Sequence, residues 1–370
     1  MTESRQKTNH PARRVLIFGL GDLGSRISQA IAERALATDV KLVSRGHAAS
    51  QWARMLTLGT SCRVTSEKLD ARELEAVTRV LAAFQPDLVI QCASLLSPWA
   101  LLETGSPAAL RILQAGFALQ ISAQLPIILT VMRACKSLTM SCPIINCSFP
   151  DLTHPILSRM GFAPTSGVGN VAMVARYIED VRRDLNPGRL RVIAHHAQVA
   201  PFLTGKLPTK NLVLPIVEQN GELLGEAALT FASELTSGRH FNYLTAATAV
   251  PLITALLDDT VSLHTHAPGI LGLPGGYPIS IRNKKIDLDL PPAISQEQAI
   301  AFNNTCARAD GVERIESDGN LVYTGVAIKT AKPICAELAA PLSPANLDSR
   351  LAVLLSFYND CQRSSSTSHS

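Results

Sequence analysis

The sequence from 15 to 24 is Val15-Leu-Ile-Phe-Gly19-Leu-Gly21-Asp-Leu-Gly24. Its apolar start is typical of a buried parallel strand, and the three glycines that follow have the spacing G-x-G-x-x-G. Residues 25–36 then repeat apolar side chains at helical spacing, which predicts a helix. A strand, a glycine turn and a helix start together can hold a dinucleotide pyrophosphate, because free N–H groups at the helix start attract an anion. The sequence therefore predicts dinucleotide binding.

Each glycine has a separate task in such a turn. Gly19 permits the tight turn, Gly21 lets the backbone approach the phosphates, and Gly24 lets the helix pack on the strand. The whole turn is expected to contact the cofactor: Gly19, Leu20, Gly21, Asp22, Leu23 and Gly24.

The end of the second expected strand, near residues 40–46, bears on the choice of cofactor. A site for NAD would place Asp or Glu here to bind the ribose 2′-hydroxyl, but Ser44 and Arg45 occupy this place. A serine can hydrogen-bond a phosphate oxygen and a guanidinium can pair with it, whereas a carboxylate would repel it. The pattern favours NADP, in the form NADPH, over NAD.

Length and composition limit the class of protein. A chain of 370 residues that is 46% hydrophobic predicts a globular protein of two domains. The net charge is only +4, without a basic run interleaved with aromatics, so nucleic acid is not an expected partner. The eight cysteines are scattered without a C-x-x-C motif, which indicates reduced thiols and a cytoplasmic location. The polar segment 1–11 and the lack of a run of 18 apolar residues argue against a membrane partner.

The pattern along the chain predicts an α/β fold with two domains. Residues 13–150 alternate strand and helix signals, which indicates a doubly wound parallel sheet of the Rossmann type. Residues 151–360 mix helices and short strands and predict an α+β substrate domain, while 1–12 and 361–370 are expected to be disordered. Ligands of a parallel sheet lie at the carboxyl ends of its strands. The later strands therefore add four expected cofactor contacts: Cys92, Ala93, Ser94 and Ser148.

Two common classes of nicotinamide enzyme do not fit. None of the five tyrosines is followed four residues later by lysine, which disfavours the short-chain reductases. His264 and His266, like the pair His195-His196, lack the close-spaced cysteines of the zinc enzymes, so no metal is expected. The glycine-rich segment 269–278 is interpreted as a structural turn before a strand.

Three segments resemble the lactate/malate dehydrogenase family in order and spacing. They are Asn146-Cys-Ser-Phe-Pro150-Asp-Leu-Thr-His-Pro-Ile-Leu, Gly167-Val-Gly169-Asn170-Val-Ala-Met173-Val-Ala-Arg176-Tyr and Arg191-Val-Ile-Ala-His195-His196-Ala-Gln-Val-Ala-Pro201. They are similar to the family's Asn-Pro motif, to its helix with an aspartate and an arginine, and to the strand that ends in its catalytic histidine. The chain is thus similar to a distant member of this family, and the resemblance implies a C-terminal domain like that of the family. It also implies a homodimer or homotetramer.

The resemblance implies roles for two residues. His196 falls on the acid/base histidine, which protonates the carbonyl oxygen in reduction and takes the hydroxyl proton in oxidation. Arg176 falls on the arginine that grips the substrate carboxylate. His195 remains an alternative to His196.

Departures from the family pattern leave the substrate and the chemistry open. Met173 stands where the family has the aspartate that orients the histidine, so Asn170, His195 or Asp151 is considered for that task. The loop from Leu95, with Trp99, lacks the family's arginines, which suggests a larger or less charged substrate.

Three functions follow from these observations. The first is NADP(H)-dependent hydride transfer between the nicotinamide and a carbonyl or alcohol carbon, with His196 as acid/base. The second is imine reduction of the opine type, which needs less from a histidine–aspartate pair. The third is a non-catalytic NADP-binding protein.

Overall fold

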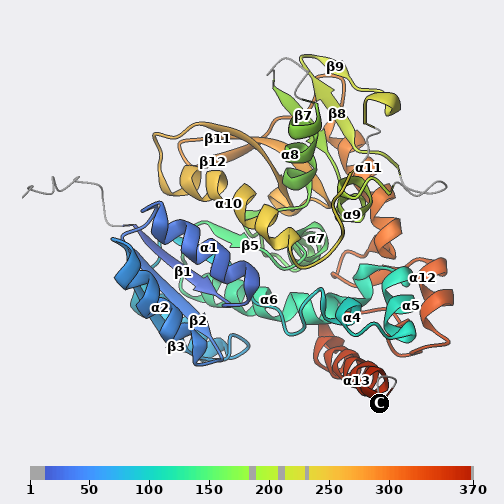
Figure 1. Ribbon diagram of the computed structural model, residues 1–370, viewed down its shortest axis with the longest axis horizontal. Coiled ribbons are helices and arrows are strands. Elements are labelled where there is room, and N and C mark those ends of the chain that lie inside the picture. Colours follow the sequence, from blue (N-terminus) through green and yellow to red (C-terminus); the bar gives the residue numbers. More distant parts are fainter. Residues whose placement is uncertain (1–12, 183–188, 207–212, 230–232, 368–370) are drawn as a thin grey trace, which may run out of the picture.

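The computed structural model describes residues 13–182, 189–206, 213–229 and 233–367 (Figure 1). The expected disorder of residues 1–12 lies outside these ranges. The expected tail from 361 begins too early, because helix α13 continues to Thr367.

A six-stranded sheet forms the N-terminal half, in the order β3-β2-β1-β4-β5-β6. Every neighbouring pair is parallel, so the predicted doubly wound sheet is confirmed. The strands are β1 (Arg14–Phe18), β2 (Asp39–Ser44), β3 (Arg63–Lys68), β4 (Leu88–Gln91), β5 (Ile144–Asn146) and β6 (Ser166–Gly167). Phe18 pairs with Val43 and with Gln91, and Gln91 pairs with Asn146. The residues that follow these strands therefore emerge together at one edge of the sheet.

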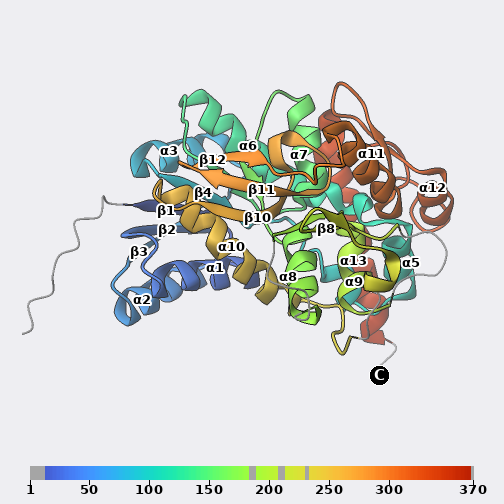
Figure 2. The same ribbon diagram turned by 90° about the horizontal axis from the view of Figure 1, so that it is seen from above.

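Helices cover both faces of this sheet (Figures 1 and 2). The helices in this part of the chain are α1 (Asp22–Glu33), α2 (Ala48–Gly59), α3 (Leu74–Phe84), α4 (Ala100–Glu103), α5 (Pro107–Ala115), α6 (Ile121–Ser137) and α7 (Pro150–Arg159), of which α4 and α5 lie beyond the end of the sheet. Two helices from the end of the chain return to it: α10 (Phe241–Leu257) packs on α1, and α13 (Leu347–Thr367) packs on α6. The expected domain boundary at residue 150 is corrected here, since β6 belongs to the sheet.

The C-terminal half contains small antiparallel sheets, as expected of an α+β unit. The strands are β7 (Leu190–Ile193), β8 (Ile216–Gln219), β9 (Glu222–Leu223), β10 (Leu263–Pro268), β11 (Gly276–Arg282), β12 (Lys285–Leu288), β13 (Val312–Ile315) and β14 (Leu321–Tyr323). The remaining α-helices are α8 (Val171–Val181), α9 (His196–Leu203), α11 (Gln296–Ala307) and α12 (Gly325–Ala331). The segment 269–278 is mostly buried, apart from the exposed Leu271, and it runs into β11, in agreement with its interpretation as structural.

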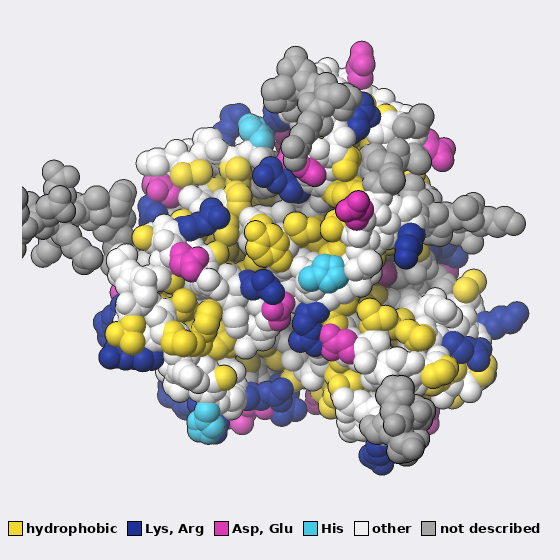
Figure 3. Space-filling model, viewed as in Figure 1, with side chains coloured by type: hydrophobic (Ala, Val, Ile, Leu, Met, Phe, Trp, Pro, Cys, Tyr) yellow, Lys and Arg dark blue, Asp and Glu magenta, His cyan; other side chains and the backbone are white. Residues whose placement is uncertain are grey.

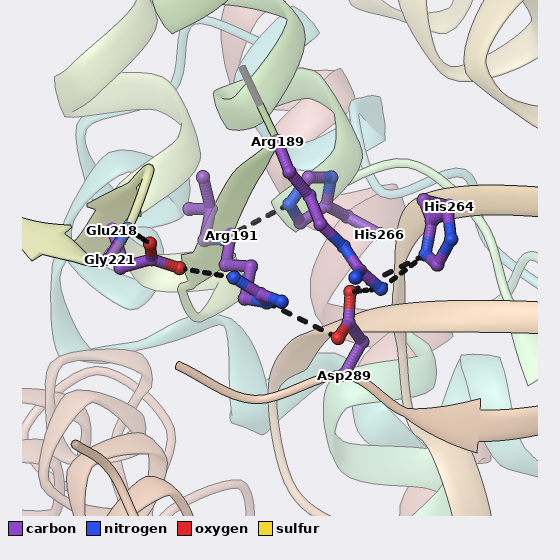
Figure 4. Close-up of polar contacts among 8 residues, drawn as sticks. Arg189, Arg191, Glu218, Gly221, His264, His266 and Asp289 are labelled. Atoms are coloured by element: carbon purple, nitrogen blue, oxygen red, sulfur yellow. Dashed lines mark hydrogen bonds and ion pairs between the residues drawn. The ribbon is translucent and has the colours of Figure 1, made fainter. Parts of the chain in front are cut away.

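A network of charges joins the strands of the C-terminal half (Figure 4). Arg191 on β7 donates to Glu218 on β8 over 2.7 Å and to Asp289 over 3.2 Å. Asp289 also pairs with Arg189, whose guanidinium contacts His264. Glu218 is 1% exposed, so its pair with Arg191 is shielded from water, whereas Arg189 and His264 are more exposed. Together these contacts join β7, β8 and β10.

The helical stretch 117–137 is long and apolar enough to cross a membrane. Most of it is buried inside the molecule, which is the environment of a core helix. Pro126 lies inside α6, and the stretch is separated from α5 at Gly116, whose φ is 129°. On the face shown in Figure 3, cationic and anionic side chains are interspersed.

Candidate active site

A cavity of about 700 Å³ lies at the carboxyl edge of the parallel sheet. Residues that end or follow all six strands line it, together with residues of α8, α9 and the start of α10. The strand-end residues on its wall include Gly19, Ser44, Leu69, Cys92, Ser148 and Val168. One continuous space thus runs from the glycine turn to His196, as an extended dinucleotide with a substrate beside it requires.

The glycine turn fits a pyrophosphate. A Cβ at Gly19 would lie 2.5 Å from the backbone nitrogen of Ala93, and one at Gly24 would lie 2.0 Å from the carbonyl oxygen of Gly19. A Cβ at Gly21, by contrast, would have no atom within 4 Å apart from its chain neighbours, and this residue caps α1 and faces open space. Gly24 does not line the cavity because it packs helix against strand, while the other five residues of the turn do line it.

Asp22 is the first residue of α1, at the helix start that would attract the negative charge of a bound pyrophosphate. Its carboxylate accepts hydrogen bonds from Arg26 over 3.0 Å and from Asn242 over 2.9 Å. Burial alone would raise the pKa of Asp22, but these two donors lower it overall. The charge of Asp22 is thereby partly compensated by Arg26.

Ser44 and Arg45 both line the cavity at the end of β2. Ser44 accepts a hydrogen bond from the nitrogen of Gly46 over 3.3 Å, and Arg45 is exposed. The nearest acid on this part of the wall is Asp70, which pairs with Arg72 over 2.6 Å. The hydrogen bonds from Arg72 lower the pKa of Asp70, and the charge of Arg45 adds to this effect.

Cys92, Ala93, Ser94 and Ser148 all line the cavity where β4 and β5 end. The Ser148 hydroxyl donates to the carbonyl oxygen of Ala93 over 2.8 Å, which fixes one loop against the other. The sulfur of Cys92 lies 3.4 Å from that of Cys147, and this contact and burial raise the pKa of Cys147.

His196 is the first residue of α9, and carboxylates contact both its backbone nitrogen and its ring. Its backbone nitrogen donates to Oδ1 of Asp151 over 2.8 Å. Its ring Nδ1 lies 2.8 Å from Oδ2 of Asp310, as a donor if the ring carries its proton there. Nε2 has no hydrogen-bond partner among the described residues, and the ring lines the cavity. The ring can therefore exchange a proton at Nε2 while Asp310 holds it in place.

The charges around His196 make it a better base. Burial alone would lower the pKa of His196, but the charge and the hydrogen bond of Asp310, with the charge of Asp151, raise it above 6.5. Burial acts on Asp310 in the opposite sense, and the charge and hydrogen bond of His196 lower its pKa overall. The pair is thus stabilised as imidazolium and carboxylate.

Asp310 is the site residue that sequence reasoning missed. It ends a single helical turn, Arg308–Asp310, after α11, and no motif surrounds it. The backbone of Asp310 packs on Gly116, where a Cβ would lie 2.3 Å from the Asp310 carbonyl oxygen. Only the close approach of these two distant segments places the carboxylate beside the imidazole.

The three residues considered for that task have other contacts. Asn170 lines the cavity, and its amide donates to Asp151. His195 is buried, and its Nδ1 accepts from the nitrogen of Ala197 over 3.2 Å as the cap of α9, while burial lowers its pKa. Asp151 supports the backbone of His196 but is not bonded to its ring.

Arg176 does not line the cavity, contrary to the expected grip on a substrate carboxylate. Its side chain is 73% exposed and pairs with Glu179 one turn further along α8. Besides Arg45, the described part of the wall includes Arg239, before α10, which donates two hydrogen bonds to Glu103 on α4.

No known family model and no curated protein sequence matches this chain. Among solved structures it resembles the minor L-lactate dehydrogenase from Enterococcus mundtii in its ligands-bound form. The TM-score is 0.51 and the identity 15%, over 82% of this chain and 99% of that chain. The ligands-unbound form gives a TM-score of 0.50 and 14% identity, over 80% of this chain and 95% of that chain. The chain has the lactate dehydrogenase fold.

The resemblance stated from the sequence is therefore confirmed at the level of the fold. Within the lactate dehydrogenase fold, His196 stands at the start of α9 and Met173 on α8. The Met173 sulfur lies 3.3 Å from the Thr245 hydroxyl and offers no carboxylate, whereas Asp310 places a carboxylate beside the His196 ring.

Proposed function

We propose that the protein is an NADP(H)-dependent oxidoreductase that transfers hydride between the nicotinamide and a carbonyl or alcohol carbon. The observation that carries the proposal is the His196–Asp310 pair, which shares one cavity with the glycine turn at the edge of the sheet. We further propose that it acts in the cytoplasm as a homo-oligomer.

Residues of the chain would divide the work as follows. Backbone around Gly21 would hold the pyrophosphate, and Ser44 and Arg45 the 2′-phosphate. The bound cofactor would supply the hydride. Nε2 of His196 would give its proton to the carbonyl oxygen in reduction and remove the hydroxyl proton in oxidation. Asp310 would orient the ring and stabilise its cationic form, and Phe117 and Phe149 would keep water from it.

Carbonyl reduction is favoured over the two alternatives by Asp310. Imine reduction would tolerate the missing aspartate at position 173, and a non-catalytic role was suggested by that loss together with the missing loop arginines. Because Asp310 supplies a carboxylate to the same ring, the two residues would act together as an acid/base pair.

Calorimetry with NADPH and NADH tests the cofactor. We expect tight NADPH binding, weaker NADH binding, and a loss of NADPH affinity of at least tenfold in Arg45→Ala, since one charged contact to phosphate is worth about 1.5–3 kcal/mol. Arg54→Ala, an exposed arginine on α2 outside the cavity, should bind like the wild type. Equal affinity for both cofactors would contradict the NADP assignment.

Turnover of a panel of carbonyl compounds tests the chemistry. His196→Gln should lose at least about 10²-fold in kcat while it still binds NADPH. His264→Gln, outside the cavity, serves as the control. Full turnover by His196→Gln would remove the proposed mechanism, and reduction of imines alone would favour the second function.

A further inference from the structure

The cavity wall beside His196 is aromatic and aliphatic. The rings of Phe117 and Phe149 meet edge to face with centroids 4.6 Å apart, and the His196 ring centroid lies 4.9 and 4.7 Å from theirs. More of the lining is apolar: Trp99, Leu102, Leu113, Met173, Val199 and Phe241. Four of these, Trp99, Met173, Val199 and Phe241, belong to one hydrophobic cluster and so share a wall. A substrate that reaches Nε2 of His196 therefore lies beside apolar side chains.

This part of the cavity offers a substrate carboxylate little compensation. Among the described residues, the lining includes two arginines and no lysine. Arg45 lies far along the sheet at the end of β2. Nε and Nη2 of Arg239 donate hydrogen bonds to the carboxylate of Glu103 over 2.8 and 2.6 Å, and this carboxylate compensates the charge of Arg239. A buried carboxylate without a paired cation is costly, and Asp310 beside His196 would add repulsion.

Several neutral polar groups on the wall are also engaged. The amide of Asn170 donates to Asp151, and that of Asn242 donates to Asp22 over 2.9 Å. The Thr245 hydroxyl lies 3.3 Å from both the Phe241 carbonyl oxygen and the Met173 sulfur. The unpartnered Nε2 of His196 is thus a polar atom of this wall that is left for a substrate.

We infer that the substrate is an uncharged ketone, or the matching secondary alcohol, with an aromatic or branched aliphatic group near the reacting carbon and no carboxylate on it. This inference rests on the proposed function. In reduction, the carbonyl carbon receives hydride from NADPH and the oxygen receives the proton of His196, which gives the secondary alcohol and NADP⁺. His196 then regains a proton from solvent.

Two ketones of the same skeleton test this substrate class. Phenylacetone carries a methyl group where phenylpyruvate carries a carboxylate, so their comparison isolates the charge. We expect kcat/KM with NADPH to be at least tenfold higher for phenylacetone. Faster reduction of phenylpyruvate would overturn the substrate class alone. Reduction of other carbonyl compounds but of neither ketone would also overturn the substrate class, whereas reduction of no carbonyl compound by a protein that binds NADPH would overturn the proposed function.

Binding gives a readout that does not depend on turnover. The chain has two tryptophans, and Trp52→Phe leaves Trp99 on the cavity wall as the only one. Quenching of its fluorescence can be titrated with each ketone in the presence of NADP⁺, which cannot reduce them. The dissociation constant should be at least tenfold lower for phenylacetone, and equal or tighter binding of phenylpyruvate would overturn the substrate class.

A change in the charge of the cavity wall should alter the preference between phenylpyruvate and phenylacetone. Glu103→Gln removes the carboxylate that neutralises Arg239, so the phenylpyruvate to phenylacetone ratio of kcat/KM should rise at least threefold. Glu179→Gln is the matched control, because Glu179 pairs with Arg176 outside the cavity. An unchanged ratio in Glu103→Gln would overturn the assignment of charge exclusion to the Arg239–Glu103 pair.

Discussion

Nδ1 of His196 lies 2.8 Å from Oδ2 of Asp310, although the two residues are 114 positions apart in the chain. His196 begins α9, and Asp310 ends the single turn after α11. The carboxylate thus reaches the ring from a different segment than the α8 position that Met173 occupies. Four predictions follow from this arrangement and from the buried charges elsewhere.

Asp310→Asn should reduce kcat by at least about 10²-fold, because the amide cannot stabilise the imidazolium form of His196. It should also shift the pH profile. Reduction needs protonated His196, and Asp310 raises the pKa of that ring, so reduction by the wild type fades only above the raised pKa. In the variant, the midpoint of the pH profile should move to lower pH, because burial lowers the pKa of His196 and the charge of Asp310 no longer opposes it. A pH profile of kcat/KM that keeps the wild-type midpoint would show that Asp310 does not act on the ring.

Gly116→Ala should impair the reaction without touching the ring. The new Cβ would lie 2.3 Å from the Asp310 carbonyl oxygen, and the φ of 129° at this position disfavours alanine. Displacement of Asp310 by about 1 Å is expected to reduce kcat on the order of 10²-fold. Gly59→Ala, with no atom within 4 Å of the added Cβ, is the control. Wild-type kcat in Gly116→Ala would mean that Asp310 tolerates the shift.

Stability should fall as the pH drops from 7 to 5. Burial lowers the pKa of His154 and of His266 to about 4, against 6.5 for an exposed histidine. The unfolded chain therefore takes up protons first as the pH falls through 6.5, and the loss continues toward pH 4. At pH 5 it should be on the order of 2 kcal/mol for each histidine.

Urea unfolding at the two pH values measures this loss. His266→Asn should show a smaller difference between pH 7 and pH 5 than the wild type, even if it is less stable at both. A stability that rises on acidification would contradict the assignment of neutral, buried histidines.

Asp289→Ala should destabilise the C-terminal half. Asp289 pairs with both Arg189 and Arg191, and the Arg191 side chain is only 15% exposed (Figure 4). Removal of the Asp289 carboxylate therefore leaves the buried positive charge of Arg191 poorly compensated. The expected loss is about 3 kcal/mol in the free energy of unfolding. Glu316→Ala breaks an exposed pair with Arg314 and should cost less than about 1 kcal/mol. Similar losses in the two variants would show that the buried network adds no stability.

Local patterns in the sequence determined the half of the chain that forms the parallel sheet. The apolar run and glycines of residues 15–24 predicted the first strand, its turn and the helix start, because these depend on neighbours along the chain. The strand ends that line the cavity followed from the alternation of strands and helices. The lactate dehydrogenase fold and the position of His196 beside that cavity followed from the order of three motifs.

The tertiary structure alone decided which residue pairs with His196, which arginines line the cavity and how far the parallel sheet extends. Asp310 meets His196 because Gly116 lets two distant segments approach, and no local pattern records such a contact. Arg176 had the expected spacing but faces solvent, whereas Arg239 reaches the wall and is neutralised by Glu103. Spacing along a helix places a residue on the chain, but which side chain faces a cavity depends on how the helices pack around it.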